Sequence, residues 1–201
     1  MREELSKRES ELRNHILDKA YQVFSEKSYA KTSLRDLMEC ANVNRKEISY
    51  FFKNKFEIFL ALEYRNNKEK RNVILSKAKI NDNPDEVLKN YICSRLRLFN
   101  EENYHNWIRL STEFWSLPRT NPQIDQLINK RFLAFHQDIH QLIENGINKG
   151  VFKEDVDYNT FIYYIISLIL GIGDVSGCFG RTVNENQIET ISEIVLSYIR
   201  R

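Results

Sequence analysis

The chain has 201 residues, of which 42% are hydrophobic and 12% aromatic, with six glycines and three prolines. This composition is that of a globular protein of one domain or two small ones, and it excludes a collagen-like or low-complexity chain. The formal net charge of +2 identifies no partner by itself. Three widely separated cysteines and the lack of a signal peptide argue against a disulfide-rich secreted protein, so we expect a cytoplasmic one.

The first predicted element is an amphipathic helix over residues 13–25. Its apolar residues recur with the spacing that places them on one face of a helix. We expect this face to be buried in the core of an N-terminal domain. It consists of Ile16, Leu17, Ala20, Val23 and Phe24.

Three helix starts follow at close spacing. Each consists of a Ser or Asn with an acidic residue three positions later, which is the pattern of a capping box. The three pairs are Ser33 with Asp36, Asn44 with Glu47, and Asn54 with Glu57. They predict two short helices and the beginning of a longer one, which is the arrangement of a helix-turn-helix DNA-binding domain.

The two short helices are predicted over residues 34–41 and 45–52, with a turn at Asn42, a residue type that tolerates the left-handed conformation. Residues 42–55 contain four basic side chains and one acidic one. The exposed face of the second short helix is therefore basic and aromatic, and it is predicted to enter a DNA major groove. The candidate DNA-binding residues are Thr32, Ser33, Arg45, Lys46, Ser49, Tyr50, Lys53 and Lys55.

Two kinds of contact are predicted within this set. The candidates for phosphate contacts are Thr32, Tyr50 and Lys55, and the candidates for base contacts are Arg45, Lys46 and Ser49. Lys55 lies in the first turn of a helix, where a cation is slightly unfavourable, so a DNA phosphate is its expected partner. The alternative is a small three-helix core whose basic surface is only solvated.

This part of the chain resembles the TetR family of bacterial transcriptional regulators, and the matching stretches are ILDKAYQVFSEKSYAKTSLRDLMECANVN (residues 16–44) and FFKNKFEIFLAL (residues 51–62). The resemblance implies a DNA-binding head followed by a helical domain that binds a ligand and forms a dimer. The family usually has glycine where Ser28 and Asn42 stand, and a small residue is common at Lys46. It usually has a phosphate-contacting tyrosine where Ser49 stands, and Tyr50 follows one position later. Which of the two contacts the phosphate stays open.

The rest of the chain is predicted to be helical, with short breaks at Asn-Pro pairs and polar caps. The further helices are predicted over residues 55–78, 84–99, 105–117, 122–150, 158–171 and 185–200. We therefore expect an all-α fold of about nine helices, with a helix-turn-helix domain over residues 1–54 and a ligand-binding and dimerisation domain over residues 55–201. No membrane span is expected, because the most apolar run is shorter than the roughly 20 residues that a span needs.

The last two helices carry more apolar surface than one buried side requires, which predicts a homodimer through a four-helix bundle. The predicted interface residues are Ile165, Ile169, Ile188, Ile191, Val195 and Tyr198. The alternative is that these helices only close the core of a monomer.

Aromatic residues with a few polar ones predict a pocket for a small apolar or aromatic effector. The candidate residues are Arg95, Phe99, Trp107, Leu110, Phe114, Trp115, Phe135, His136 and Tyr163. The alternative is an ordinary aromatic core.

Other chemistry finds little support in the sequence. His136, His140 and Glu144 are spaced like one edge of a metal site, but no third strong ligand is near them, so neither a metal nor a cofactor is expected. Phosphate-binding loops, nucleophile elbows and zinc-protease motifs are missing, which argues against an enzyme.

The sequence thus predicts a DNA-binding transcriptional regulator, and the favoured form is a repressor. Binding of the effector would release the repressor from its palindromic operator. The helix that begins at Lys55 would link the effector site to the DNA-binding head. The alternative is an architectural or co-regulatory DNA-binding protein without a small-molecule switch.

Overall fold

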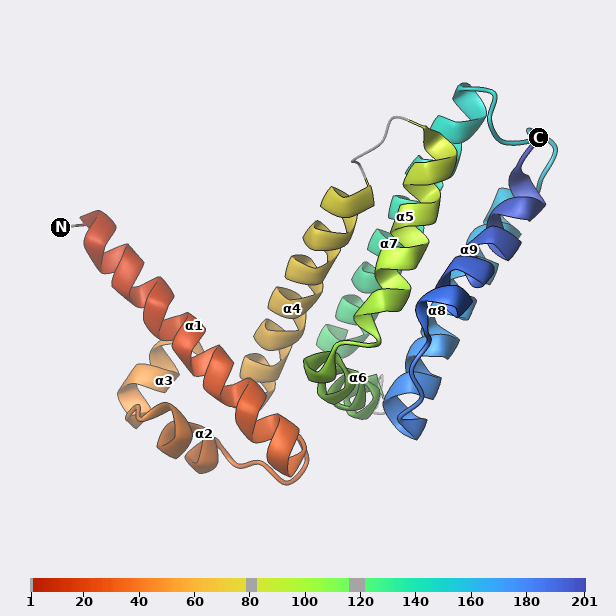
Figure 1. The fold of residues 1–201 in the computed structure, drawn as a ribbon. Coiled ribbons are helices and arrows are strands. Elements are labelled where there is room, and N and C mark those ends of the chain that lie inside the picture. The colour runs from red at the N-terminus through yellow and green to blue at the C-terminus, as the bar shows by residue number, and fades with distance from the viewer. Residues whose placement is uncertain (1, 79–82, 116–121) are drawn as a thin grey trace. The chain divides into compact units, whose positions relative to one another are not determined.

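The computed structural model describes residues 2–78, 83–115 and 122–201, and these residues form the helices α1–α9 without a β-strand (Figure 1). This confirms the predicted all-α fold. The chain divides into two compact units, Met1–Lys70 and Arg71–Arg201. The division lies within α4 (Lys55–Ala78), whereas the sequence-based boundary at residue 54 lay in front of this helix.

The first unit consists of α1 (Arg2–Lys27), α2 (Leu34–Ala41), α3 (Arg45–Phe51) and the N-terminal part of α4. The five apolar residues predicted to face inward from α1 are at most 5% exposed. The ring centroids of Phe24 in α1 and Phe59 in α4 lie 5.3 Å apart. Helix α1 begins well before residue 13, because the polar residues in front are good helix formers although they lack an apolar stripe.

Two of the three predicted capping boxes form as expected. The Ser33 hydroxyl accepts a hydrogen bond from the Asp36 amide (3.1 Å), and the Asp36 carboxylate accepts one from the Ser33 amide (2.7 Å). The Asn44 side chain accepts from the Glu47 amide (3.1 Å), and Glu47 accepts from the Asn44 amide (2.7 Å). These boxes fix the starts of α2 and α3.

The third capping box is shifted by one residue. Asn54 accepts from the Glu57 amide (2.9 Å), but the Glu57 carboxylate accepts from the amide of Lys53 (2.8 Å) and not from the amide of Asn54 itself. The side chains of Asn54 and Glu57 still cap the start of α4.

Two of the three turns of the first unit contain a left-handed residue that is not glycine. Asn42, with φ of 51°, ends α2 as predicted, while Ser28, with φ of 69°, follows α1. A left-handed conformation costs a residue with a Cβ about 1–2 kcal/mol. The strain at Ser28 is held in place by the Thr32 hydroxyl, which donates to the Ser28 carbonyl at 2.7 Å.

The second unit begins with the end of α4 and contains five further helices, α5 (Pro84–Leu98), α6 (Glu102–Trp115), α7 (Pro122–Asn148), α8 (Tyr158–Phe179) and α9 (Glu185–Ile199). Helix α5 lies at the centre and packs on α7, α8 and α9, while α6 packs on α8 (Figure 1). The predicted caps start three of these helices, with Asn83 before α5, Asp157 before α8 and Asn184 before α9.

Helix α8 is longer than the predicted residues 158–171, because Gly171 and Gly173 do not end it. A Cβ at Gly173 would lie 2.9 Å from the ring of Phe99, so this glycine serves close packing. By length and composition alone, α8 is long and apolar enough to cross a membrane. In this structure Phe161, Ile165 and Ile169 on one side of it are buried, as in the core helix of a globular unit.

Candidate nucleic-acid interface and effector site

The outward face of α3 is exposed, while Ile48 on its opposite face is completely buried. Burial of Ile48 and the cap at Asn44 fix the position of the helix, so its exposed side chains project from a rigid element. At helical spacing these side chains lie on one face. The exposed predicted DNA-binding residues are Arg45, Lys46, Ser49, Tyr50 and, just after the helix, Lys53.

Tyr50 has a partner that the sequence did not indicate. Its side chain is 67% exposed, and its hydroxyl donates a hydrogen bond of 2.8 Å to Glu9, 41 residues earlier in α1. The hydrogen bond to Glu9 and the charge of this carboxylate raise the pKa of Tyr50. The phenol therefore stays protonated and acts as a donor.

Thr32 has a structural role that the sequence-based interpretation missed, while Ser33 has the capping role that the sequence predicted. Thr32 is only 3% exposed and its hydroxyl is bonded to the carbonyl of Ser28, so its side chain does not present a surface to DNA. Ser33 is exposed, but its hydroxyl is the cap of α2 and also donates to Asp36 at 2.6 Å. The predicted phosphate contact of Thr32 is therefore not supported.

The ammonium group of Lys55 lies inside the first unit. It donates to the carbonyls of Tyr29 and Thr32, both at 2.7 Å, and lies 4.3 Å from the centre of the Tyr29 ring. Lys55 thus clamps the segment between α1 and α2 to the start of α4. This explains the cation in the first turn of α4 without a phosphate, and the predicted phosphate contact stays a prediction.

Residues 16–62 match the family described as bacterial regulatory proteins, tetR family. The matched residues include both capping boxes and the whole of α2 and α3. Over these residues the chain is similar to the N-terminal, DNA-binding domain of that family. The resemblance seen in the sequence is confirmed, and α2 and α3 are the helix-turn-helix of a DNA-binding transcriptional regulator.

Solved structures extend the likeness in fold to the second unit. A putative transcriptional regulator from Saccharomonospora viridis in complex with choline superposes with a TM-score of 0.80 at 21% identity, covering 96% of this chain and 100% of that one. A TetR transcription regulator from Haloarcula marismortui gives 0.82 at 15% identity with the same coverage. A putative fatty acid metabolism regulator from Clostridium perfringens gives 0.71 at 19% identity, covering 91% of this chain and 97% of that one. No curated protein matches the sequence.

The predicted effector residues do not form one cluster. Phe99, Trp107 and Leu110 are at most 6% exposed and belong to the core around α5 and α6. His136 and Tyr163 form a second group with Phe132, whose ring lies 5.6 Å from that of the exposed Tyr163. The side chains of Phe114 and Trp115 lie outside the described part of the structure.

A third group surrounds Arg95 and includes an ion pair between a buried carboxylate and a partly exposed arginine. The carboxylate of Asp138 in α7 is 2% exposed and accepts two hydrogen bonds from Arg71 in α4, at 2.5 and 2.8 Å. Arg95 in α5 lies 4.0 Å from the same carboxylate and 4.3 Å from the centre of the Phe135 ring. Its Nε is buried and has no hydrogen-bond partner among the described residues. Arg71 and Asp138 are 67 positions apart, so no local pattern could reveal this site.

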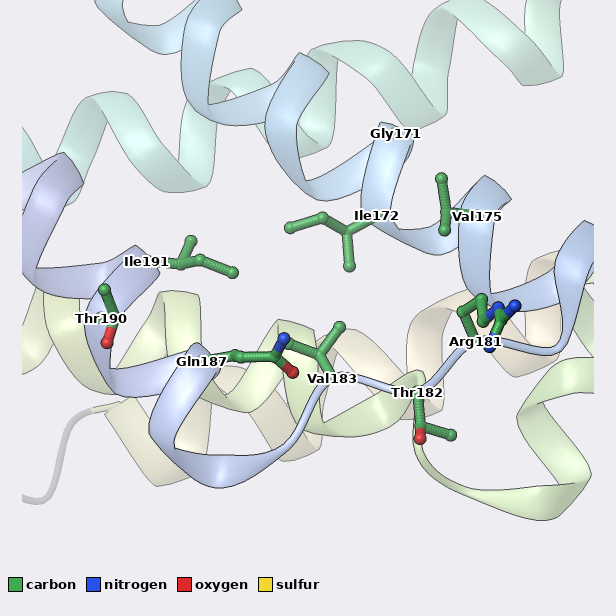
Figure 2. Close-up of a pocket in the computed structure, with 9 residues that line it drawn as sticks. All are labelled: Gly171, Ile172, Val175, Arg181, Thr182, Val183, Gln187, Thr190 and Ile191. Atoms are coloured by element: carbon green, nitrogen blue, oxygen red, sulfur yellow. The ribbon is translucent and has the colours of Figure 1, made fainter.

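A hollow of about 530 Å³ lies elsewhere, between α8 and α9 (Figure 2). None of the predicted effector residues lines it, but Ile191 of the predicted dimer interface does. Its lining residues come from α8, from the segment after it and from α9. They are Gly171, Ile172, Val175, Arg181, Thr182, Val183, Gln187, Thr190 and Ile191.

The predicted dimer residues are mostly turned inward. Ile165, Ile169, Ile188 and Val195 are at most 2% exposed, because they form the contacts of α8 and α9 with their own unit, so they have no surface for a second chain. Ile191 is half-buried and Tyr198 is 59% exposed. The exposed apolar surface of these helices instead lies on the side that faces away from the core of the unit. It comprises Tyr164, Val175, Phe179, Ile194 and Tyr198.

The histidine pair forms no metal site. The rings of His136 and His140 stack 6.3 Å apart, and His140 lies 3.9 Å from Glu144. Within the described part of the chain, no three His, Cys, Asp or Glu side chains are grouped to hold a metal ion.

Proposed function

We propose that the protein is a cytoplasmic transcriptional repressor that acts by binding and not by catalysis, and that a small apolar or aromatic effector releases it from a palindromic operator. The observation that carries the proposal is the exposed face of α3, a helix capped at one end and anchored by Ile48, where Arg45 and Lys46 stand on the helix and Lys53 follows it. Such a face suits the major groove, with cations for phosphates and side chains for base edges.

The repressor acts as a homodimer. Tyr164, Val175 and Phe179 share one face of α8, while Ile194 and Tyr198 share one face of α9 with the half-buried Ile191. The hollow between α8 and α9 adjoins these residues, so the surface is apolar and also indented. Two copies related by a two-fold axis would cover it with a four-helix bundle, and a two-fold dimer requires a palindromic DNA site.

The effector acts on the second unit through the contacts of Arg71, Arg95 and Asp138. Arg71 is the first residue of this unit, and it stands on α4, whose preceding turns belong to the first unit. A ligand that alters the bond between Arg71 and Asp138 therefore acts on a helix shared by both units. It shifts DNA affinity only if it binds the DNA-free and DNA-bound states unequally. Relatives described as a choline complex and as a fatty acid metabolism regulator suggest ligands with an alkyl part as the first compounds to screen.

The test is selection of duplexes from a randomised library at physiological salt, followed by footprinting of the best binder. The proposal predicts one palindromic sequence with half-sites about one helical turn apart. Compounds that change the fluorescence of the two tryptophans, Trp107 and Trp115, are then added to the complex. Release of the DNA by at least one compound is expected.

The alternative is an architectural DNA-binding protein without an effector. It is favoured by the compactness of the aromatic core, since Phe99, Trp107 and Leu110 are buried by their own unit. Binding without a preferred sequence, and without response to any compound, would establish this alternative.

A further inference from the structure

The DNA-reading face of α3 includes a carboxylate from another helix. Glu9 lies in α1, and its Oε1 accepts the hydrogen bond of 2.8 Å from the Tyr50 hydroxyl. Glu9 and Tyr50 are both exposed, so solvent and DNA can reach the pair. Four residues further along the same face of α1, the guanidinium of Arg13 lies 5.4 Å from the centre of the Phe52 ring. Helix α1 therefore contacts both α3, through Glu9, and the residue that follows α3, through Arg13.

A carboxylate is an unfavourable neighbour for DNA. A phosphate bound to the Tyr50 hydroxyl would take the place of Glu9 and would lie close to its negative charge. Hydrogen bonds to an ionised carboxylate are also roughly twice as strong as those between neutral groups, so the hydroxyl is held firmly in the free protein. Both effects oppose DNA binding and neither depends on the base sequence.

We propose that Glu9 is a positioning residue that occupies the Tyr50 hydroxyl in the free protein and yields it to a DNA phosphate, and thereby limits the affinity of the protein for all DNA. The inference rests on the proposed function, in that Tyr50 must contact the DNA backbone. The inference also selects Tyr50 over Ser49 as the residue that contacts the phosphate. The hydroxyl of Tyr50 is exposed and already binds an anionic group, the Glu9 carboxylate.

The test compares Glu9→Gln with Glu11→Gln in full-length protein. Both changes remove one negative charge from the exposed surface of α1, but Glu11 lies two positions later and so faces away from α3. The glutamine at position 9 can still accept a hydrogen bond from Tyr50, so the fold is kept and only the charge changes. Dissociation constants are measured by fluorescence anisotropy for the selected operator and for an unrelated duplex.

We expect Glu9→Gln to tighten binding to both duplexes by a similar factor, roughly fivefold at about 50 mM salt and less at higher salt. Glu11→Gln should have a clearly smaller effect. In a Tyr50→Phe background the gain from Glu9→Gln should shrink, because there is no hydroxyl to release. Weaker binding of Tyr50→Phe itself would show the phosphate contact.

Three results would overturn the inference. An equal gain in DNA affinity from Glu9→Gln and Glu11→Gln would mean that only the net charge of the protein matters. Weaker binding of Glu9→Gln would mean that Glu9 holds Tyr50 in its DNA-bound position. An unchanged gain in affinity from Glu9→Gln in the Tyr50→Phe background would mean that Glu9 does not act through the Tyr50 hydroxyl. Failure of the wild-type protein to bind any duplex would instead contradict the proposed function, so the two failures are distinguishable.

Discussion

The two units of this protein build their sites in opposite ways. The candidate DNA-binding face lies within one short segment, residues 45–53, and local caps and one buried isoleucine are enough to set it up. The charged site of the second unit joins α4, α5 and α7 through residues up to 67 positions apart. A site made by local structure can be read from a sequence, whereas a site made by packing cannot. The variants below test this contrast.

The largest expected effect concerns the exposed apolar face of the second unit. Ile194→Asp should dissociate the proposed homodimer, because its two-fold axis would place two unpaired carboxylates in an apolar interface at a cost of about 4 kcal/mol or more. Light scattering coupled to size-exclusion chromatography should show half the wild-type mass. Ser76→Asp adds the same charge to the exposed surface of α4 and should leave the mass unchanged. An unaltered mass for Ile194→Asp would refute the interface.

Asp138→Asn tests the ion pair of this buried carboxylate. The change keeps the shape of the side chain but removes the charge that pairs with Arg71, and since Arg71 is 42% exposed, the free energy of unfolding should fall by about 2 kcal/mol. Urea unfolding followed by circular dichroism gives this value. The exposed Asp155→Asn should change it by less than about 0.5 kcal/mol. If the two variants unfold at the same urea concentration, the pair does not stabilise the second unit.

These sites also show how far the sequence could be read. The caps at Ser33 and Asn44 and the left-handed Asn42 were predictable, because each depends on side chains within three residues of the backbone that they satisfy. Four predicted interface residues proved to be buried, because helical periodicity identifies an apolar face without saying whether the same chain or a second one covers it. The partners of Tyr50 and Asp138 depend on how helices pack, and no local signal reports that.

Two lysines of the first unit, Lys53 and Lys55, look alike in the sequence but should have different roles. Lys55→Met should destabilise the first unit by about 1–2 kcal/mol, because the carbonyls of Tyr29 and Thr32 lose a charged donor. Lys53→Met should leave stability unchanged but weaken binding to all duplexes and reduce the slope of log affinity against log salt by about one. Thermal unfolding and salt titrations distinguish them. Equal stability of the two variants would contradict the clamp.

The smallest effect compares left-handed residues in the two units. Ser28→Gly should stabilise the protein by about 0.5–1 kcal/mol, since glycine adopts a positive φ without strain. Gly150→Ala should destabilise it by about 1 kcal/mol, because φ at this position is 70°. Differential scanning calorimetry reads both shifts. Two shifts of the same sign would mean that backbone strain at these turns is not what sets the stability.

The most direct test of the central claim is to repeat the duplex selection with Arg45→Ala and with Lys53→Ala. If the exposed face of α3 reads the operator, Arg45→Ala relaxes the base preference at one position of each half-site, while Lys53→Ala keeps the wild-type consensus at lower affinity. If Arg45→Ala selects the same consensus as the wild-type protein, with only weaker binding, then α3 does not read bases through this residue and the account of the head is wrong.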